Sequence, residues 1–388
     1  MFPSLERNCL LHPVAAAERC APIDIIRGLA LLGVLLVNLE TIFRVPLLEV
    51  ILGRRAEPTV GADHIVGLLV AHALEFKAIT IFAFLFGTGV AIQAERITSR
   101  GISPQGFLAR RFGWLFLFGL AHLFLVWNGD ILTLYAVCGF LLLPALGLRW
   151  PTLVVIGAAA MALPRIGPTL PSGGAATFLI AQAREVYATG GFVAILEFRW
   201  HETWLMIVPL LIAILSRTVG LMYWGMATWR SGILREPKSH RNKLLAALAF
   251  GVIFGVADTS FPAPLALAFV AGLLLWLKPQ RAAALPGLAA TGRMALTNYL
   301  LQSIILGFIF YGYGLGLFGR IGSAAAAAIG IVIYVVQVQL SRFWLSRFQF
   351  GPFEWVWRSL AYGFSKAPAT SRSATVRERV LDQRIGNE

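Results

Sequence analysis

Charged residues are scarce in this sequence. Asp, Glu, Lys and Arg together make up 13% of the 388 residues, whereas soluble globular domains carry about a quarter. Hydrophobic residues make up 58%, and the mean hydropathy is +0.74. This composition excludes an ordinary soluble domain and indicates a membrane protein with several spanning helices.

Cysteine and the familiar enzyme motifs are scarce or missing as well. Three cysteines do not suggest a disulfide framework. The sequence contains no GxSxG turn, Walker loop, dinucleotide fingerprint or haem attachment motif. We expect no metal site, because the candidate histidines lack ligand spacing or a clear carboxylate companion. These histidines are His64, His72, His122 and His201.

Positive charge, in contrast, is in excess, with a formal net charge of +14. Such an excess is found in nucleic-acid-binding proteins, but in a chain this apolar it is typical of cytoplasmic loops rich in Lys and Arg. We therefore expect no nucleic-acid partner and a chain surrounded by membrane lipids. An oligomer is possible.

Apolar runs of roughly 20 residues predict an all-α bundle of about ten transmembrane helices. They fall near 23–43, 66–94, 107–127, 130–148, 152–164, 204–229, 243–259, 261–277, 294–312 and 321–345. Lys and Arg gather in alternate loops, which predicts that both termini lie in the cytoplasm.

The spans divide the chain into five parts. Residues 1–22 have no clean apolar core or cleavage site and predict a cytoplasmic leader. Residues 23–164 hold five helices with the candidate active-site residues. The long segment 165–203 predicts an extracytoplasmic loop or interfacial helix. Residues 204–366 hold five more helices and an interfacial segment, and 367–388 is typical of a disordered tail.

A polar seam runs along the first predicted helix, in DIIRGLALLGVLLVNLE (24–40). Asp24 and Arg27 are three residues apart and therefore neighbours on a helix. Arg27 and Asn38 share one face, roughly 16 Å apart along the axis. Ionisable side chains are expensive in a bilayer, so this seam is a functional candidate. The alternative is an interhelical hydrogen bond from Asn38 and an interfacial position for Arg27.

His122 and Asp130 form a second candidate in GLAHLFLVWNGDIL (119–132). The turn NGD places Asp130 at the start of the next helix, so the two side chains are expected to approach each other across a hairpin. A carboxylate that orients a histidine ring is the usual arrangement for a general base. The alternative is that His122 bonds a backbone carbonyl and Asp130 only caps a helix.

Arg217, Glu75 and Lys77 are further candidates for substrate binding. Arg217 lies twelve residues from Arg230 and is expected near the middle of the bilayer, where it needs a carboxylate or an anionic ligand. Glu75 and Lys77 stand at the start of a strongly apolar run, and snorkelling is the alternative for Lys77.

The ninth predicted span carries a polar patch in GRMALTNYLLQSII (292–305). Asn298 and Gln302 are four residues apart, and Tyr299 is adjacent. We expect this patch on the cytoplasmic half of the span and include the three residues among the candidates for substrate binding.

These stretches together resemble the YeiB family of bacterial inner-membrane proteins, which carries the domain of unknown function 418. The resemblance rests on DIIRGLALLGVLLVN, FLFGTG, GLAHLFLVWNGDILTLYAVCG, GRMALTNYLLQS and GPFEWVWRSL, in that order. It covers the chain except 150–200 and the tail. It implies a multi-pass protein of the bacterial inner membrane.

That family is similar to a larger group of membrane acyltransferases, which includes the acyltransferase-3 enzymes and heparan-alpha-glucosaminide N-acetyltransferase. Those enzymes move an acyl group, typically from cytoplasmic acyl-CoA, to a sugar hydroxyl or amine across the membrane. The acyltransferase-3 signature is an arginine, ten residues and a histidine. Here Arg27 is followed after ten residues by Asn38, which cannot act as a general base.

The resemblance implies acyl-CoA as donor and a glycan, lipid or small-molecule acceptor. Arg27 would meet the CoA phosphates. His122, oriented by Asp130, would be the base, and Asn38 would stabilise the oxyanion. Two other functions remain open: a transporter or lipid-handling protein that uses the same polar seam, and a non-catalytic membrane partner.

Overall fold

The structure is a computed structural model that describes residues 20–53, 61–164, 170–257 and 263–362. Within those ranges the regular elements are helices, and there is no strand. In chain order the α-helices are α2 (Ala21–Asn38), α3 (Leu47–Ile51), α4 (Ala62–Leu69), α5 (Lys77–Thr98), α6 (Pro104–Ala121), α7 (Leu132–Leu142), α8 (Trp150–Ala162), α9 (Gly173–Thr189), α10 (Phe192–Glu202), α11 (Val208–Arg230), α12 (Arg241–Ala257), α13 (Ala263–Trp276), α14 (Pro279–Ala283), α15 (Pro286–Arg293), α16 (Ala295–Phe310), α17 (Ser323–Leu345) and α18 (Pro352–Tyr362).

The predicted all-α membrane bundle is confirmed. In the part of the chain that the structure describes, five helical segments are long and apolar enough to cross a membrane, namely 21–43, 62–98, 104–126, 192–230 and 323–345. A sixth results if α15 and α16, which meet at a bend of 81°, form one broken span. Other apolar helices, such as α8 and α13, are shorter. The count of ten spans and the cytoplasmic position of the termini therefore stay predictions.

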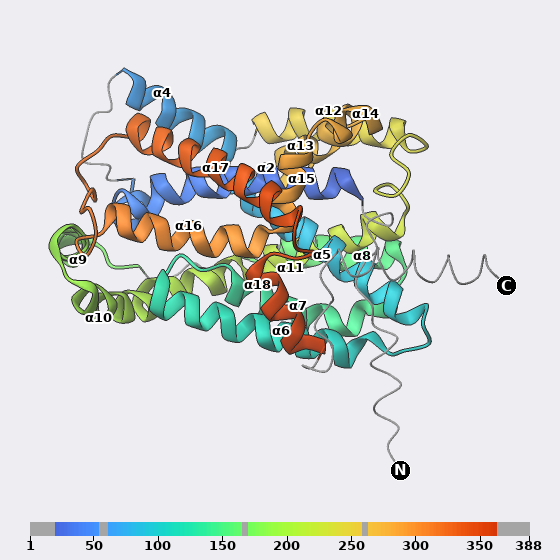
Figure 1. Cartoon of the computed structure of the whole chain (residues 1–388), viewed down its shortest axis with the longest axis horizontal. Coiled ribbons are helices and arrows are strands. Elements are labelled where there is room, and N and C mark those ends of the chain that lie inside the picture. The colour runs from blue at the N-terminus through green and yellow to red at the C-terminus, as the bar shows by residue number, and fades with distance from the viewer. Residues whose placement is uncertain (1–19, 54–60, 165–169, 258–262, 363–388) are drawn as a thin grey trace, which may run out of the picture.

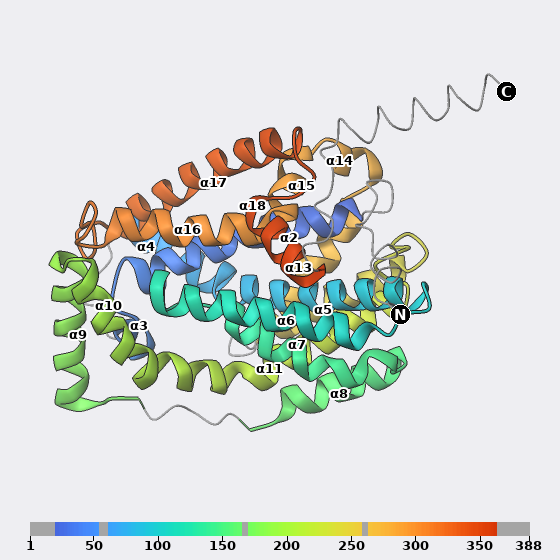
Figure 2. The same ribbon diagram turned by 60° about the horizontal axis from the view of Figure 1, so that its bottom comes forward.

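The long helices run side by side along the long axis of the molecule (Figure 1). One end is closed by α9 and α10, and α9 lies across the direction of α11 and α16 (Figure 2). We call this the His122 end, because α6 ends there, directly before His122. The opposite end, where α2 begins and α5 finishes, is the Arg27 end. The segment predicted as an extracytoplasmic loop or interfacial helix thus contains two helices, α9 and α10.

Backbone contacts through glycine hold the long helices together. Gly87 on α5 lies against the carbonyl of Met222, and Gly225 on α11 lies against the carbonyl of Phe84. A Cβ atom at either glycine would overlap the facing backbone. Small residues at such crossings are typical of helices packed in a membrane, where close backbone approach replaces the hydrophobic driving force.

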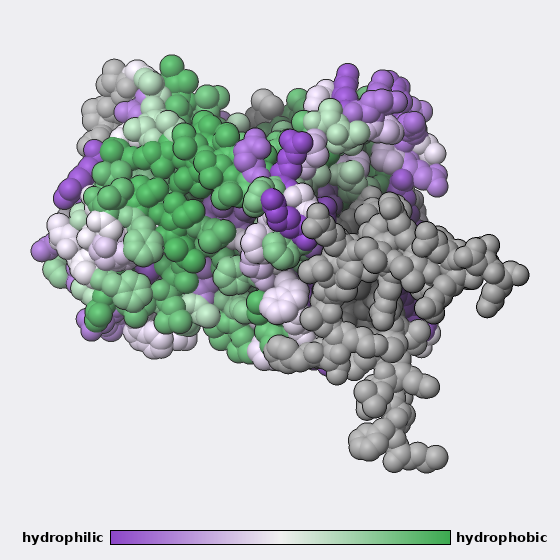
Figure 3. Space-filling model, in the orientation of Figure 1, coloured by the Kyte–Doolittle hydropathy of each residue, from purple (hydrophilic) through white to green (hydrophobic). Residues whose placement is uncertain are grey.

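Side chains facing outward are largely apolar. Figure 3 shows an apolar surface over α16 and α17, with hydrophilic residues toward both ends of that surface. Exposed residues on α17 include Ile331, Val332, Val335 and Leu340. A soluble protein rarely exposes so large a continuous apolar surface, and lipid contact explains it here.

Three π-helical turns lie at the His122 end. They continue α2 as Leu39–Phe43, follow α6 as His122–Val126, and join α10 to α11 as Thr203–Ile207. A π turn adds a residue to the helical turn and rotates the side chains that follow it. The turns therefore change which of the residues that follow α2, α6 and α10 face the interior at this end. The predicted second span also departs from one continuous helix, because Phe76 adopts φ = 59° between α4 and α5.

Candidate active site

His122 and Asp130 are in contact, as the hairpin spacing predicts. Nδ1 of His122 lies 2.9 Å from Oδ1 of Asp130, and the side chains are 1% and 0% exposed. The other carboxylate oxygen accepts the backbone N–H of Thr133 at 2.7 Å, in the first turn of α7. The carboxylate is therefore fixed on both oxygens and holds the imidazole ring in one orientation.

The second ring nitrogen of His122 is available for chemistry. Because a carboxylate only accepts hydrogen bonds, Nδ1 carries the ring proton in the neutral tautomer. This leaves the lone pair on Nε2, a buried atom with no hydrogen-bond partner among the described residues. A buried polar atom without a partner is uncommon and needs an explanation. One explanation is a proton-accepting role toward a substrate.

Aromatic rings surround this pair. The Tyr299 ring on α16 is 5.2 Å from the His122 ring, and the Trp127 ring is 6.1 Å away. Trp127 is fully buried and stacks on Phe43 at 4.6 Å. These rings exclude bulk water from His122, and electrostatic interactions are stronger in such a site than in water.

A cavity of about 700 Å³ lies between α2, α5, α6, α7, α16 and α18. Its polar part is at the Arg27 end and holds Arg27, Arg96, Arg111, Arg293 and Arg358 together with Asp24, Glu95 and Glu354. Farther along the same helices its walls are apolar or aromatic and include Leu31, Val34, Phe82, Leu115, Leu132 and Tyr299. Tyr299 lines the cavity and also contacts His122, so its ring stands where the cavity and the buried pair meet.

The polar part of the cavity is built around the break between α15 and α16. Nη1 of Arg27 donates to Asp24 at 2.9 Å and to the carbonyl of Gly292, the next-to-last residue of α15, at 3.3 Å. Glu354 on α18 accepts the backbone N–H groups of Leu296 and Thr297 at 2.8 and 3.1 Å. Backbone N–H groups in the first turn of a helix have no partner within that helix, and the Glu354 carboxylate accepts two of them at the start of α16. Burial raises the pKa of Glu354.

Three of the predicted site residues therefore line one cavity. Asp24 and Arg27 lie at its polar part and Tyr299 at its far wall, with His122 and Asp130 directly behind Tyr299. Their roles in substrate binding and catalysis stay predictions. Among the described residues, no group of three or more His, Cys, Asp or Glu side chains is placed to hold a metal ion.

The remaining predicted residues lie elsewhere. Asn38 is half-buried at the end of α2, and the structure records no hydrogen bond from its side chain to His122 or Asp130. Glu75 and Lys77 flank the break at Phe76. Arg217 is half-buried in α11. None of the four lines the main cavity.

Asn298 and Gln302 face α17. Nδ2 of Asn298 donates to the Ser341 hydroxyl at 2.9 Å, and Nε2 of Gln302 donates to Gln337 at 2.8 Å. Gln337 in turn donates to the Asn298 carbonyl at 3.0 Å. This is a buried network between helices. Tyr299, next to Asn298 in sequence, faces the cavity instead.

A second polar cluster at the His122 end was not found from the sequence. Oε2 of Glu202 accepts hydrogen bonds from Asn128 at 2.6 Å and from Tyr187 at 2.5 Å. Arg199 donates to the carbonyl of Val126 at 2.6 Å. The cluster thus holds the turn WNGD, which carries Asp130, through hydrogen bonds to Asn128 and to the Val126 carbonyl. The available signal was Arg199 and Glu202, three residues apart in a short polar stretch between two apolar runs, but their partners are distant in sequence.

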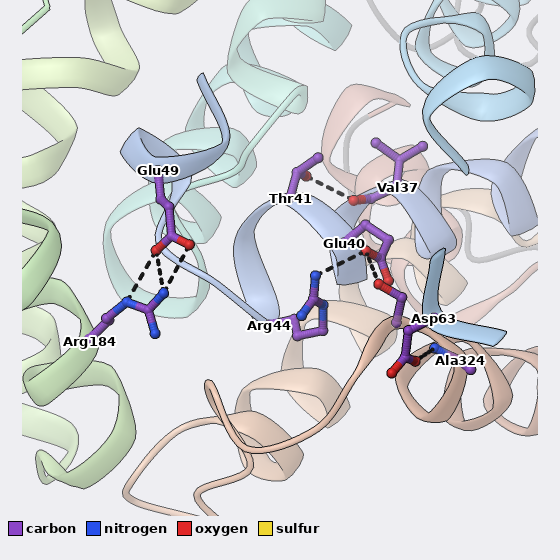
Figure 4. Close-up of polar contacts among 9 residues, drawn as sticks. Val37, Glu40, Thr41, Arg44, Glu49, Asp63, Arg184 and Ala324 are labelled. Carbon is purple, nitrogen blue, oxygen red and sulfur yellow. Dashed lines mark hydrogen bonds and ion pairs between the residues drawn. The ribbon is translucent and has the colours of Figure 1, made fainter. Parts of the chain in front are cut away.

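Other ion pairs and caps close the same end (Figure 4). Glu49 on α3 and Arg184 on α9 form a bidentate pair with distances of 2.7 to 3.1 Å. Asp63 accepts the backbone N–H of Ala324 at 2.7 Å and so caps α17. These contacts fix α9 and α17 relative to the N-terminal part of the chain.

Comparisons with known proteins find relatives along almost the whole chain. A family model described as a protein of unknown function (DUF418) matches residues 252–364. The chain is 34% identical over 387 residues to the uncharacterized protein YxaH of Bacillus subtilis (strain 168), covering 91% of this chain and 96% of the relative. It is 31% identical over 361 residues to an uncharacterized 39.9 kDa protein in the amylase 3' region of Bacillus acidopullulyticus, covering 91% and 96%. It is 27% identical over 397 residues to the uncharacterized protein YeiB of Escherichia coli (strain K12), covering 92% and 100%.

Proposed function

The chain belongs to the YeiB (DUF418) family, and we propose that it is an acyltransferase of the bacterial inner membrane. It would move an acyl group from cytoplasmic acyl-CoA to a hydroxyl or amine at the extracytoplasmic side. The observation that carries this proposal is the buried His122–Asp130 pair, whose Nε2 has no partner in the described part of the chain, directly behind the wall of a large cavity.

The donor suits the main cavity by shape and by charge. Ligand pockets for small molecules have volumes of about 300 to 1,000 Å³, and this cavity is about 700 Å³. Five arginines meet three carboxylates at its polar part. Guanidinium groups pair with phosphate oxygens through two parallel hydrogen bonds. The phosphates of acyl-CoA would stay at the Arg27 end, and the acyl group would reach along Leu31 and Leu115 toward Tyr299.

The chemistry then follows from the state of His122. Nε2 removes a proton from the acceptor hydroxyl or amine as the acceptor oxygen or nitrogen attacks the thioester carbonyl. The C–S bond breaks when the tetrahedral intermediate collapses, and the CoA sulfur takes the proton back from His122. Asp130 holds Nδ1–H and stabilises the imidazolium that forms between these steps. Tyr299 must shift, because its ring separates His122 from the cavity.

The test is acyl transfer in purified protein. Wild type in proteoliposomes receives acetyl-CoA labelled in the acetyl group on the Arg27 side and an extract of periplasmic acceptors on the other side. His122→Gln should reduce transferred label by about 10² to 10⁴. His72→Gln, an exposed histidine outside the cavity, is the matched control and should transfer as wild type. Equal rates in wild type and His122→Gln would overturn the proposal.

The broken helix favours one alternative, a transporter of an anionic amphiphile. Discontinuous helices near a binding site are a recurring feature of transporters, and the 81° bend between α15 and α16 lies at the polar part of the cavity. This alternative predicts movement of an intact labelled amphiphile across proteoliposomes without acyl transfer. It also predicts that His122→Gln leaves this movement unchanged.

A further inference from the structure

The His122 end contains a second cavity with no role in the donor path. Its volume is about 400 Å³, and it lies between α9, α10 and the segment that starts α3. Its apolar wall includes Leu48, Leu179, Val186, Phe198 and Met206. Its polar wall consists of Gln182, Glu197, His201 and Glu202. Lys and Arg do not occur among the described residues that line it, which is the opposite of the main cavity.

Glu202 gives this cavity an acceptor that two hydrogen bonds hold in place. The residue is 8% exposed, and both of its hydrogen bonds, from Asn128 and Tyr187, go to Oε2. Its Oε1 has no hydrogen-bond or ion-pair partner within the described ranges. Oε1 is therefore the accessible oxygen of an otherwise buried carboxylate that lines a cavity, and a cationic donor would form the stronger, charge-assisted bond to it.

The neighbouring Arg199 forms no hydrogen bond with this carboxylate among the described residues. Arg199 is three residues before Glu202 on α10, but its Nη1 donates to the Val126 carbonyl. Its guanidinium carbon lies 4.6 Å from the Tyr311 ring centre, and Arg199 does not line the second cavity. Tyr187, which bonds Glu202, also lies against the Tyr311 ring at 5.0 Å. The arginine thus supports the WNGD turn and leaves the cavity with acidic character.

We propose that the second cavity binds a small primary amine with an apolar body. The ammonium group donates to Oε1 of Glu202, and the body packs against the Leu179 and Phe198 side of the cavity. Asn128 donates to the other oxygen of this carboxylate, so one hydrogen bond connects the amine site to the turn that carries Asp130 and orients His122. The amine is then an acyl acceptor, which is the one step that rests on the proposed function.

Acyl transfer to such an amine forms an amide. The bound ammonium loses one proton to solution, and the neutral nitrogen attacks the thioester carbonyl. The new C–N bond forms, the second nitrogen proton goes to Nε2 of His122, and the C–S bond breaks. CoA leaves as the thiol with that proton, and the product is an amide.

Binding is tested with a pair of probes that differ in charge but little in shape, benzylamine and benzyl alcohol. Calorimetry on the full-length protein in detergent, at a pH where benzylamine is protonated, should give saturable binding for benzylamine. Binding of benzyl alcohol should be at least about tenfold weaker, because it lacks the charge-assisted bond. Equal affinity for the two probes would overturn the proposal.

Two variants and one control test whether benzylamine binds in the second cavity. Glu202→Gln keeps an oxygen for Asn128 and Tyr187 but removes the charge, and should weaken benzylamine binding about tenfold or more. Leu179→Trp fills part of the cavity from α9, leaves the charge of Glu202 unchanged and should abolish binding of both probes. Glu185→Gln, an exposed carboxylate on α9 outside the cavity, should bind as wild type. Unchanged affinity in Leu179→Trp would place the amine elsewhere and overturn the proposal.

The acceptor role is separated from binding with acetyl-CoA. Wild type should form N-benzylacetamide, whereas His122→Gln should bind benzylamine normally and form little product. Normal binding in wild type without any amide product would support the amine site and count against the acyltransferase. Amide formation with no loss in Glu202→Gln would support the acyltransferase and overturn the amine site.

Discussion

The two ends of the bundle hold charge in different ways. At the Arg27 end, the side chains of Arg27 and Asp24 are 26% and 16% exposed and border a cavity with excess arginine. At the His122 end, His122 and Asp130 are 1% and 0% exposed and are enclosed by aromatic rings. The first arrangement suits an anionic ligand that enters from water. The second suits a proton transfer that must exclude water.

The backbone also differs between the two ends, in how regular helix is interrupted. At the Arg27 end a helix is interrupted, and α15 and α16 meet at an angle of 81° beside Arg27. At the His122 end, π turns continue the helices and adjust side-chain direction without a break. A break exposes backbone groups that can bind a ligand or a capping carboxylate such as Glu354. A π turn repositions the side chains that follow it inside a closed interior, as after His122.

The largest predicted effect is a loss of acyl-transfer rate, and it tests the His122 end. Asp130→Asn keeps the shape of the pair but lets the amide donate to Nδ1, which favours the wrong tautomer of His122. We expect acyl transfer to fall by about 10³ to 10⁴, measured as labelled acetyl transferred per minute. Asp63→Asn is the matched control, because Asp63 caps α17 at the same end. It should cost about 1 kcal/mol of stability and leave the rate unchanged. A rate drop in both variants would mean that the end is merely fragile.

The next effect concerns the region between the two ends. Asn298→Ala removes the bonds to Ser341 and to the Thr291 carbonyl and should lower stability by about 1 to 3 kcal/mol. The KM for acyl-CoA should not change, because Asn298 faces α17 and not the cavity. Ser303→Ala is the control, since that hydroxyl bonds only within its own helix, to the Tyr299 carbonyl. Unfolding midpoints in detergent check this, and a raised KM would return Asn298 to the binding site.

The sequence predicted local relations at both ends well. Residues three or four apart share a helix face, and that rule placed Arg27 beside Asp24. A tight turn between two apolar runs placed His122 opposite Asp130. In each case the partners are within eight residues, so no knowledge of helix packing was needed.

Relations between distant helices could not be predicted from one sequence. Asn298 and Gln302 were expected to share a polar patch, but the partners that decide what they face, Ser341 and Gln337, are 43 and 35 residues away. Glu202 meets Asn128 across 74 residues. Asn38 lies on the expected helix, but a π turn follows it directly, and periodicity alone does not indicate such turns.

A smaller effect, on the KM for acyl-CoA, tests the Arg27 end. Arg27→Gln removes one of the arginines that would meet the donor phosphates. The KM for acyl-CoA should rise about tenfold with little change in kcat, which is the signature of lost uniform binding. Arg281→Gln removes an equal charge from the exposed helix α14 outside the cavity and should leave KM unchanged. If both variants raise KM equally, net charge and not the cavity attracts the donor.

The smallest effect is a pH dependence at Glu354, a half-buried carboxylate beside the polar part of the cavity at the Arg27 end. Burial raises its pKa, opposed by hydrogen bonds from the Thr297 hydroxyl and from backbone N–H groups. The folded protein therefore holds this proton more tightly than the unfolded chain. The resulting stability is present below the unfolded-state pKa and is lost as pH rises through the folded-state pKa.

Glu354→Gln should remove this dependence, so its unfolding midpoint in detergent should change less between acid and neutral pH than that of wild type. Glu236→Gln, at an exposed site, should follow wild type. If Glu354→Gln and wild type keep parallel profiles, Glu354 is as hydrated as its neighbours. The Arg27 end would then be hydrated throughout, because the Glu354 carboxylate on α18 would no longer be shielded from water at the start of α16. The His122–Asp130 pair alone would then distinguish the two ends by its burial.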